Sequence, residues 1–154
     1  MSRDENVRIV FDTYDGDIDD IVVYQFFKCH MIFDVKMGEN FRRKARMVAG
    51  GHMTTSPSSL TYSSAVSRDS VRIALTIAAL NGLSTLACDI QNAYLTAPCR
   101  EKNWTTTVPE FGSESGKNML VVRALYGLKL SGAAFRAFLA ETLYDLGYRP
   151  VELL

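Results

Sequence analysis

The most informative stretch of this chain is Cys88-Asp89-Ile90-Gln91-Asn92-Ala93-Tyr94-Leu95. The residues that lead into it, 83–88, predict a half-buried strand, because apolar side chains run up to a lone acidic residue, Asp89. A carboxylate in that position is hydrogen-bonded or holds a cation, since an unpaired buried charge is too costly. The stretch alone leaves the function open. It gains meaning from a second stretch further along the chain, Leu125-Tyr126-Gly127-Leu128-Lys129.

The charge of the chain is unevenly distributed. Of its 154 residues, 17 are basic and 17 are acidic, yet residues 1–24 hold seven acidic and only two basic side chains. From residue 25 onward, fifteen basic residues stand against ten acidic ones, which favours a polyanionic partner such as nucleic acid. The length predicts one domain, and a hydrophobic fraction of 47% is sufficient for a core.

The sequence contains no targeting or zinc-binding pattern. No run of about eighteen uncharged apolar residues predicts a membrane span. The first residues, Met1–Asn6, lack the apolar centre of a signal peptide. The three cysteines have no Cys-x-x-Cys spacing and predict reduced thiols rather than disulfides. We therefore expect an intracellular protein that does not bind membranes.

The hydrophobic pattern predicts an α+β fold with an antiparallel sheet and two main helices. A hairpin is expected from a strand at 26–36, a turn at 37–40 and a strongly basic strand at 41–49. Polar loops are expected at 52–64 and 109–117. The other predicted elements are short strands at 7–11, 21–24, 83–88, 104–108 and 119–123, and two helices, one between Ser67 and Gly82 and one between Ser131 and Gly147.

Several segments together resemble the reverse transcriptases of copia-type LTR retrotransposons, and they occur in the family's order. Lys44-Ala45-Arg46-Met47-Val48-Ala49-Gly50-Gly51 is similar to the family's K-A-R-L-V-A-x-G motif. Asp89–Leu95 is similar to D-V-K-x-A-F-L, and Leu125–Lys129 matches L-Y-G-L-K at every position. Tyr62–Arg72 is similar to the stretch before the family's first palm helix, and Glu101–Gly112 to the segment that ends in P-x-G-F.

This resemblance implies the fingers hairpin and part of the palm of a right-hand polymerase. It places this partial reverse transcriptase domain at residues 25–154, preceded by an acidic segment at 1–24. The implied reaction is RNA-directed DNA synthesis, with an RNA template, a DNA primer and deoxynucleotides as partners. Two Mg²⁺ ions are the implied cofactors, and oxygen donors suit that cation.

The resemblance also assigns the metal ligands and the residues near the sugar. Asp89 matches the family's first catalytic aspartate, which is a metal ligand, and the carbonyl of Ile90 is the expected second oxygen ligand. Tyr94 matches the aromatic position that crowds a ribose 2′ hydroxyl and so favours deoxynucleotides. Ala93 is small, which lets its backbone amide approach the nucleotide.

Four more residues are expected to bind the nucleotide or the template. Lys44 and Arg46 share one face of their strand, which suits the neutralisation of triphosphate or template phosphates. Tyr126 and Gly127 are expected to bring backbone close to the nucleotide. From the residues alone, the alternatives are a solvated basic face for the charge run and a plain strand-to-helix turn at Gly127.

The chain departs from the family chiefly at one motif, and in a smaller way at Gly132, where the family commonly has proline. The family's palm carries Tyr-x-Asp-Asp on a later hairpin, and this sequence has no such string. Asp19-Asp20, the adjacent aspartates, precede the fingers segment and lack an apolar strand before them. With Asp89 alone, two Mg²⁺ ions have too few ligands, so we expect no polymerase activity from this polypeptide by itself.

Two other interpretations stay open. The chain could be a non-catalytic retroelement remnant that at most binds nucleic acid. It could also be an unrelated small α+β interaction domain. That last interpretation predicts Asp89 on the opposite side of the fold from the face that carries Lys44 and Arg46.

Overall fold

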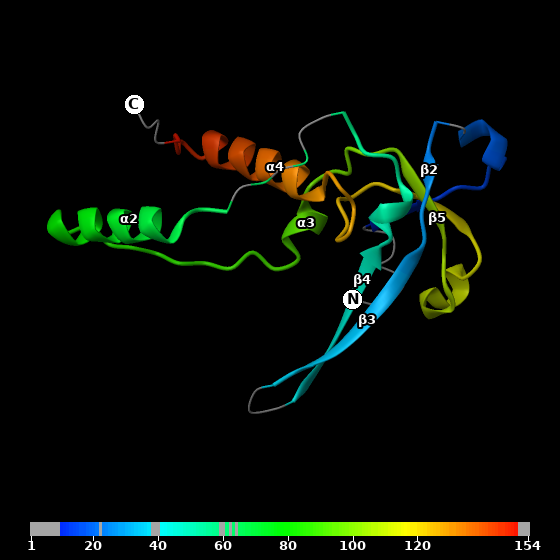
Figure 1. Ribbon diagram of the computed structural model, residues 1–154, viewed down its shortest axis with the longest axis horizontal. Coiled ribbons are helices and arrows are strands. Elements are labelled where there is room, and N and C mark those ends of the chain that lie inside the picture. The colour runs from blue at the N-terminus through cyan, green and yellow to red at the C-terminus, as the bar shows by residue number, and fades with distance from the viewer. Residues whose placement is uncertain are drawn as a thin grey trace.

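The computed structural model describes residues 10–21, 23–37, 41–58, 61, 63 and 65–150 of the chain. The elements in chain order are β1 Phe11–Thr13, η1 Ile18–Ile21, β2 Gln25–Phe26, β3 Cys29–Lys36, β4 Arg42–Ala49, η2 Gly51–Met53, α2 Arg68–Leu80, α3 Ala93–Thr96, β5 Asn103–Thr106, η3 Pro109–Glu114, β6 Asn118–Val121 and α4 Ser131–Asp145. The β3–β4 hairpin projects from the body of the molecule in one direction, and α2 and α4 project in another (Figure 1).

A four-stranded sheet in the order β1-β6-β5-β2 holds the main core. The pairs β1–β6 and β5–β6 are antiparallel, and only the short β2 runs parallel to its neighbour β5. Met119 and Val121 alternate with less buried residues along β6 and pack with Phe11, Phe27 and Leu125 in the core. The predicted mixed fold with antiparallel sheets and helices is confirmed.

The predicted basic hairpin is also confirmed. β3 and β4 pair antiparallel, from Cys29 opposite Ala49 at the inner end to Lys36 opposite Arg42 at the outer end. The inner pair is buried and the outer pair is exposed, so the hairpin is anchored only at its base. The predicted turn falls mostly on residues 38–40, which lie outside the described residues.

The strand predicted at 26–36 is in fact two strands that belong to different sheets. Phe27 separates them: it is 0% exposed, and its N–H donates to the carbonyl of Trp104 at 3.1 Å. Because this ring is buried in the core, the chain leaves the four-stranded sheet here and enters the hairpin. The strand predicted at 21–24 is wrong, since Ile21 ends η1. Of the strand predicted at 7–11, residues 7–9 lie outside the described residues.

Both predicted helices are present. Ser67 caps α2, its Oγ accepting the N–H of Ser70 at 3.0 Å. On α4, Phe135 and Phe138 pack against a small alanine cluster, whereas Leu146, beyond the helix end, is 69% exposed. α4 therefore meets the core only along its first half. Among the helices of the described ranges, none is long and apolar enough to cross a membrane.

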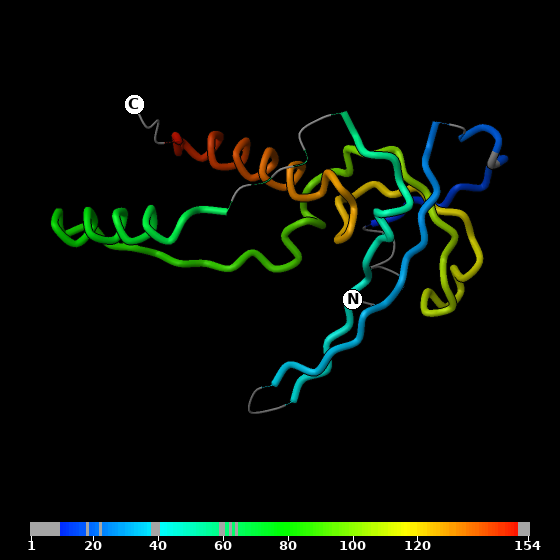
Figure 2. The backbone as a smooth tube through the Cα atoms, in the orientation of Figure 1, coloured from blue at the N-terminus to red at the C-terminus, as the bar shows by residue number. Residues whose placement is uncertain are grey.

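The strand predicted at 83–88 is wrong. Residues 83–90 lead from the end of α2 back to α3 without helix or strand (Figure 2), and every one of them is exposed, Leu86 to 94%. A strand needs a neighbour that takes up its N–H and C=O groups. No strand of the described residues pairs with this segment. Asp89 therefore stands on an exposed segment and not at the end of a strand.

Candidate functional site

A cavity of about 620 Å³ lies between the β3–β4 hairpin and the segment that precedes α3. The hairpin contributes basic side chains, the segment contributes Asp89 and its neighbours, and the turn before α4 contributes an aromatic ring. The lining residues are Lys36, Arg42, Arg43, Lys44, Ala45, Arg46, Asp89, Ile90, Gln91, Asn92 and Tyr126. Five residues that the sequence singled out thus meet in one cavity: Lys44, Arg46, Asp89, Ile90 and Tyr126.

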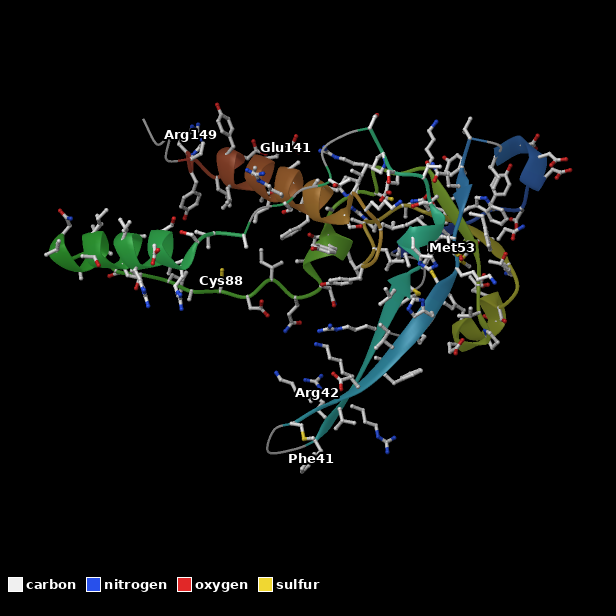
Figure 3. All side chains as sticks on the ribbon, in the orientation of Figure 1. Phe41, Arg42, Met53, Cys88, Glu141 and Arg149 are labelled. Atoms are coloured by element: carbon white, nitrogen blue, oxygen red, sulfur yellow. The ribbon has the colours of Figure 1, made fainter. Side chains whose placement is uncertain are left out.

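Strand pairing places the cations of the hairpin on a common face. Arg42, Lys44 and Arg46 alternate along β4, so they share one face. Lys36 lies opposite Arg42 on β3 and adds a fourth positive charge to that face. Figure 3 shows Arg42 beside Phe41 at the outer end of the hairpin. Among the described residues no ion pair joins these cations to a carboxylate, although Asp34 lies opposite Lys44 in the register and shares the same face.

Asp89 and Ile90, the residues expected to bind the metal, both line the cavity. Asp89 is the one carboxylate among its lining residues, and Ile90 is 43% exposed. Within the described ranges no group of three His, Cys, Asp or Glu residues could hold a metal ion. One carboxylate and one carbonyl suit a hydrated Mg²⁺ ion but do not make a two-ion centre. Asp19 and Asp20 belong to η1 and do not line this cavity.

The chain reverses sharply after the Asp89 segment. Asn92 has a left-handed backbone, with φ of 51°, a conformation that asparagine tolerates better than most residues. It precedes the short helix α3, in which the N–H of Leu95 donates to its carbonyl at 2.8 Å. Ala93 and Tyr94 therefore follow directly on the lining segment, half buried and at the first turn of α3.

Tyr94 and Tyr126 form a stacked pair. Their ring centroids are 4.7 Å apart and their planes meet at 30°. Phe135 of α4 supports Tyr94 from another side, at 6.0 Å between ring centroids. Tyr126 lines the cavity and Tyr94 does not, so the residue expected to read the sugar lies behind the ring of its neighbour.

Gly127 lies where two chain segments approach closely. Its φ is +96°, and an added Cβ atom would fall far inside van der Waals contact of the carbonyl oxygen of Ala49. The N–H of Ala49 donates to the carbonyl of Tyr126 at 2.7 Å. Gly127 thus joins the turn before α4 to the inner end of β4.

The structure adds residues that sequence reasoning missed. Lys36 lines the cavity because it pairs with Arg42, and the expected hairpin could have revealed it once the register was fixed. Gln91 and Asn92 also line it, and nothing in their pattern indicated this. The cavity joins Asp89 to the basic face of the hairpin, whereas an unrelated interaction domain was expected to separate them.

Comparison with known proteins supplies the family. Residues 25–154 match the family model described as reverse transcriptase (RNA-dependent DNA polymerase). No curated protein and no solved structure gave a significant match. The family match spans most of the chain, includes every residue of the cavity and agrees with the copia-type motifs. The chain belongs to the reverse transcriptase (RNA-dependent DNA polymerase) family.

Proposed function

We propose that residues 25–154 are the fingers and first palm segment of a copia-type reverse transcriptase, and that the cavity binds an incoming deoxynucleoside triphosphate. The observation that carries this proposal is the convergence of Lys44, Arg46 and Asp89 on a single cavity that Tyr126 also lines. These groups come from three separate parts of the chain. The cavity of about 620 Å³ is within the range that small-molecule sites occupy, roughly 300–1,000 Å³.

In this proposal the hairpin holds the phosphates. Lys44 and Arg46 donate charge-assisted hydrogen bonds to triphosphate oxygens. Arg42 and Lys36, further out on the same face, extend the positive surface toward the phosphates of a template strand. The arrangement accounts for the excess of basic residues from position 25 onward.

The ring pair holds the sugar. Tyr126 faces the cavity, and Tyr94, stacked behind it, fixes the space that remains beside the sugar. A 2′ hydroxyl would need that space, so deoxynucleotides are preferred. The small side chain of Ala93 leaves room for the nucleotide beside its backbone.

Asp89 and the carbonyl of Ile90 are the proposed metal ligands. Bound Mg²⁺ would supply positive charge that stabilises phosphate oxygens during transfer. A second carboxylate is required before two ions can be held, and none of the other residues that line the cavity supplies one. We therefore propose that these residues bind the nucleotide but do not complete a polymerase active site.

Nucleotide binding tests the metal role directly. Calorimetry with dTTP, with and without Mg²⁺, is expected to show tighter binding with the ion for the unmodified chain. Asp89→Asn is expected to abolish this dependence on Mg²⁺. Asp145→Asn, which neutralises an exposed carboxylate at the end of α4, is the matched control and should retain it. An Asp89→Asn variant with undiminished Mg²⁺ dependence would show that Asp89 is not the ligand.

Primer extension tests whether the chain contains a complete polymerase active site. The purified chain, given an RNA template, a DNA primer, Mg²⁺ and deoxynucleotides, is expected to incorporate nothing. Incorporation that Asp89→Asn abolishes would mean that a second carboxylate is present.

The second candidate function, a non-catalytic remnant that binds nucleic acid, is favoured by the lone carboxylate of the cavity. It predicts binding of primer–template without Mg²⁺-dependent binding of dTTP.

A further inference from the structure

We infer that Gly51 is a positioning residue, and that the crossing of the Gly51 and Gly127 backbones sets the span between the phosphate end and the sugar end of the nucleotide cavity. The inference rests on the proposed function, because it concerns the same cavity. It goes beyond the proposed function in two ways. It names a residue that does not line the cavity, and it gives a reason why the two ends of the cavity keep a fixed separation.

The crossing is reciprocal. A Cβ atom added at Gly51 would collide with the carbonyl oxygen of Gly127 and lie 3.4 Å from the Cα of Leu128. A Cβ atom added at Gly127 would collide with the carbonyl oxygen of Ala49 and lie 3.0 Å from Cγ1 of Val48. Each segment thus occupies the space that a side chain on the other would need. Only glycine allows this approach from both sides.

Hydrogen bonds hold the crossing closed. On one side, the N–H of Ala49 donates to the carbonyl of Tyr126 at 2.7 Å. On the other side, Thr54 Oγ1 donates to the carbonyl of Gly51 at 2.9 Å, and Lys129 Nζ donates to the carbonyl of Thr54 at 2.6 Å. The two segments are therefore tied before and after the glycines. We call this crossing the glycine joint.

The glycine joint connects the two segments that carry the ends of the cavity. Along β4, Arg46 and Lys44 lead outward from it and carry the proposed phosphate contacts. On the other segment, Tyr126 is directly next to Gly127 and stacks on Tyr94 at 4.7 Å. One nucleotide must reach both groups at once, so its affinity depends on their separation. Misplacement by about 1 Å is known to cost enzymes on the order of a hundredfold in rate.

The chain offers a matched control for each glycine of the joint. Gly50 precedes Gly51, and its added Cβ would meet the carbonyl oxygen of Lys28 at 3.1 Å, a tight contact but far less severe than the collision at Gly51. Gly147 has φ of +91°, close to the +96° of Gly127, yet no atom lies within 4 Å of an added Cβ there. Gly147→Ala therefore introduces the backbone strain of Gly127→Ala without the collision.

The test compares two ligands on the full chain. Calorimetry with tripolyphosphate reports the phosphate end alone, and calorimetry with dTTP reports both ends. Gly51→Ala and Gly127→Ala are expected to keep the affinity for tripolyphosphate but to reduce the advantage of dTTP over it by roughly three- to tenfold, the worth of one aromatic contact. Gly50→Ala and Gly147→Ala are expected to keep that advantage. A purely structural defect would instead weaken both ligands together.

Each outcome decides the inference. A folded Gly51→Ala chain with an unchanged ratio of the two affinities overturns the inference and leaves the proposed function standing. An unmodified chain that binds neither ligand overturns both. Should Gly51→Ala fail to fold, hydrogen exchange of the unmodified chain decides: the Ala49 amide is expected to exchange more slowly than amides at the outer end of the hairpin. Equally fast exchange would show that the joint is not closed.

Discussion

Removal of the two central hairpin cations is expected to weaken phosphate binding by a calculable amount. Two unit charges about 4 Å apart attract by about 1 kcal/mol in water and about 4 kcal/mol at an effective dielectric constant of about 20. Lys44 and Arg46 are exposed, so the value for water is the closer guide. Lys44→Gln and Arg46→Gln are each expected to weaken the affinity for tripolyphosphate roughly fivefold to tenfold. The double variant is expected to lose more affinity than either single variant, but not necessarily the product of the two losses, because the two side chains share one ligand.

The assay is calorimetry with tripolyphosphate at low and high salt. Arg136→Gln makes the same change of charge at an exposed position on α4, away from the cavity, and is expected to alter the affinity little. Raising the ionic strength to about 1 M shortens the screening length to about 3 Å, which should shrink the difference between the double variant and the unmodified chain. If the double variant loses no more affinity than Arg136→Gln, the hairpin is not the phosphate-binding element.

Three further predictions concern stability and thiol chemistry. Leu125→Ala, at a core position 1% exposed, is expected to destabilise the fold by about 2–5 kcal/mol in urea titrations, whereas Leu86→Ala, at 94% exposure, should have little effect. Ser67→Ala removes the cap of α2 and should cost about 1 kcal/mol, seen as reduced helix content by circular dichroism. Burial raises the pKa of Cys29 to about 12, so iodoacetamide at pH 8 should label the exposed Cys88 first, by mass spectrometry. Because the raised pKa favours the neutral thiol, this contribution to stability is complete below about pH 9 and is lost as the pH rises toward 12. Equal labelling of both thiols would refute the burial of Cys29.

Features whose causes are local in the chain were predictable from the sequence. The hairpin was predicted from an apolar strand, a turn and a basic strand, all within residues 26–49. In the structure β3 and β4 pair in a single continuous register. α2 begins directly after Ser67, because the hydroxyl of this serine accepts the N–H of Ser70, which the helix leaves without a partner. Such signals involve neighbours along the chain, so periodicity and capping rules detect them.

Features that depend on distant partners were not predictable in the same way. Phe27 breaks the predicted strand because its ring is buried in the core and its N–H bonds to Trp104, which nothing in residues 26–36 indicates. The cavity residues that were predicted, Asp89, Ile90 and Tyr126 among them, came from the family motifs and not from periodicity. Their meeting depends on the glycine joint, and the pattern around Gly51 gave no sign of a partner at Gly127.

The phosphate-binding half and the metal-binding half of the proposed site differ in how firmly the fold holds them. This difference predicts the order in which the ligands bind. The cations lie on a paired hairpin, joined to Tyr126 through backbone hydrogen bonds. Asp89 lies in a segment, 84–91, whose backbone makes no hydrogen bond to another segment among the described residues. The neighbouring helix α2 carries apolar side chains such as Ile73 and Ile77 at 61% and 52% exposure, a pattern typical of a helix that other elements cover. Metal binding at Asp89 would therefore be weakened by the entropy cost of fixing its segment. Phosphate binding at the hairpin carries a smaller entropy cost, because the basic face is already formed. On the proposed function, the triphosphate is expected to bind first through Lys44 and Arg46, and Asp89 would contribute its carboxylate to a Mg²⁺ ion only once its segment is fixed.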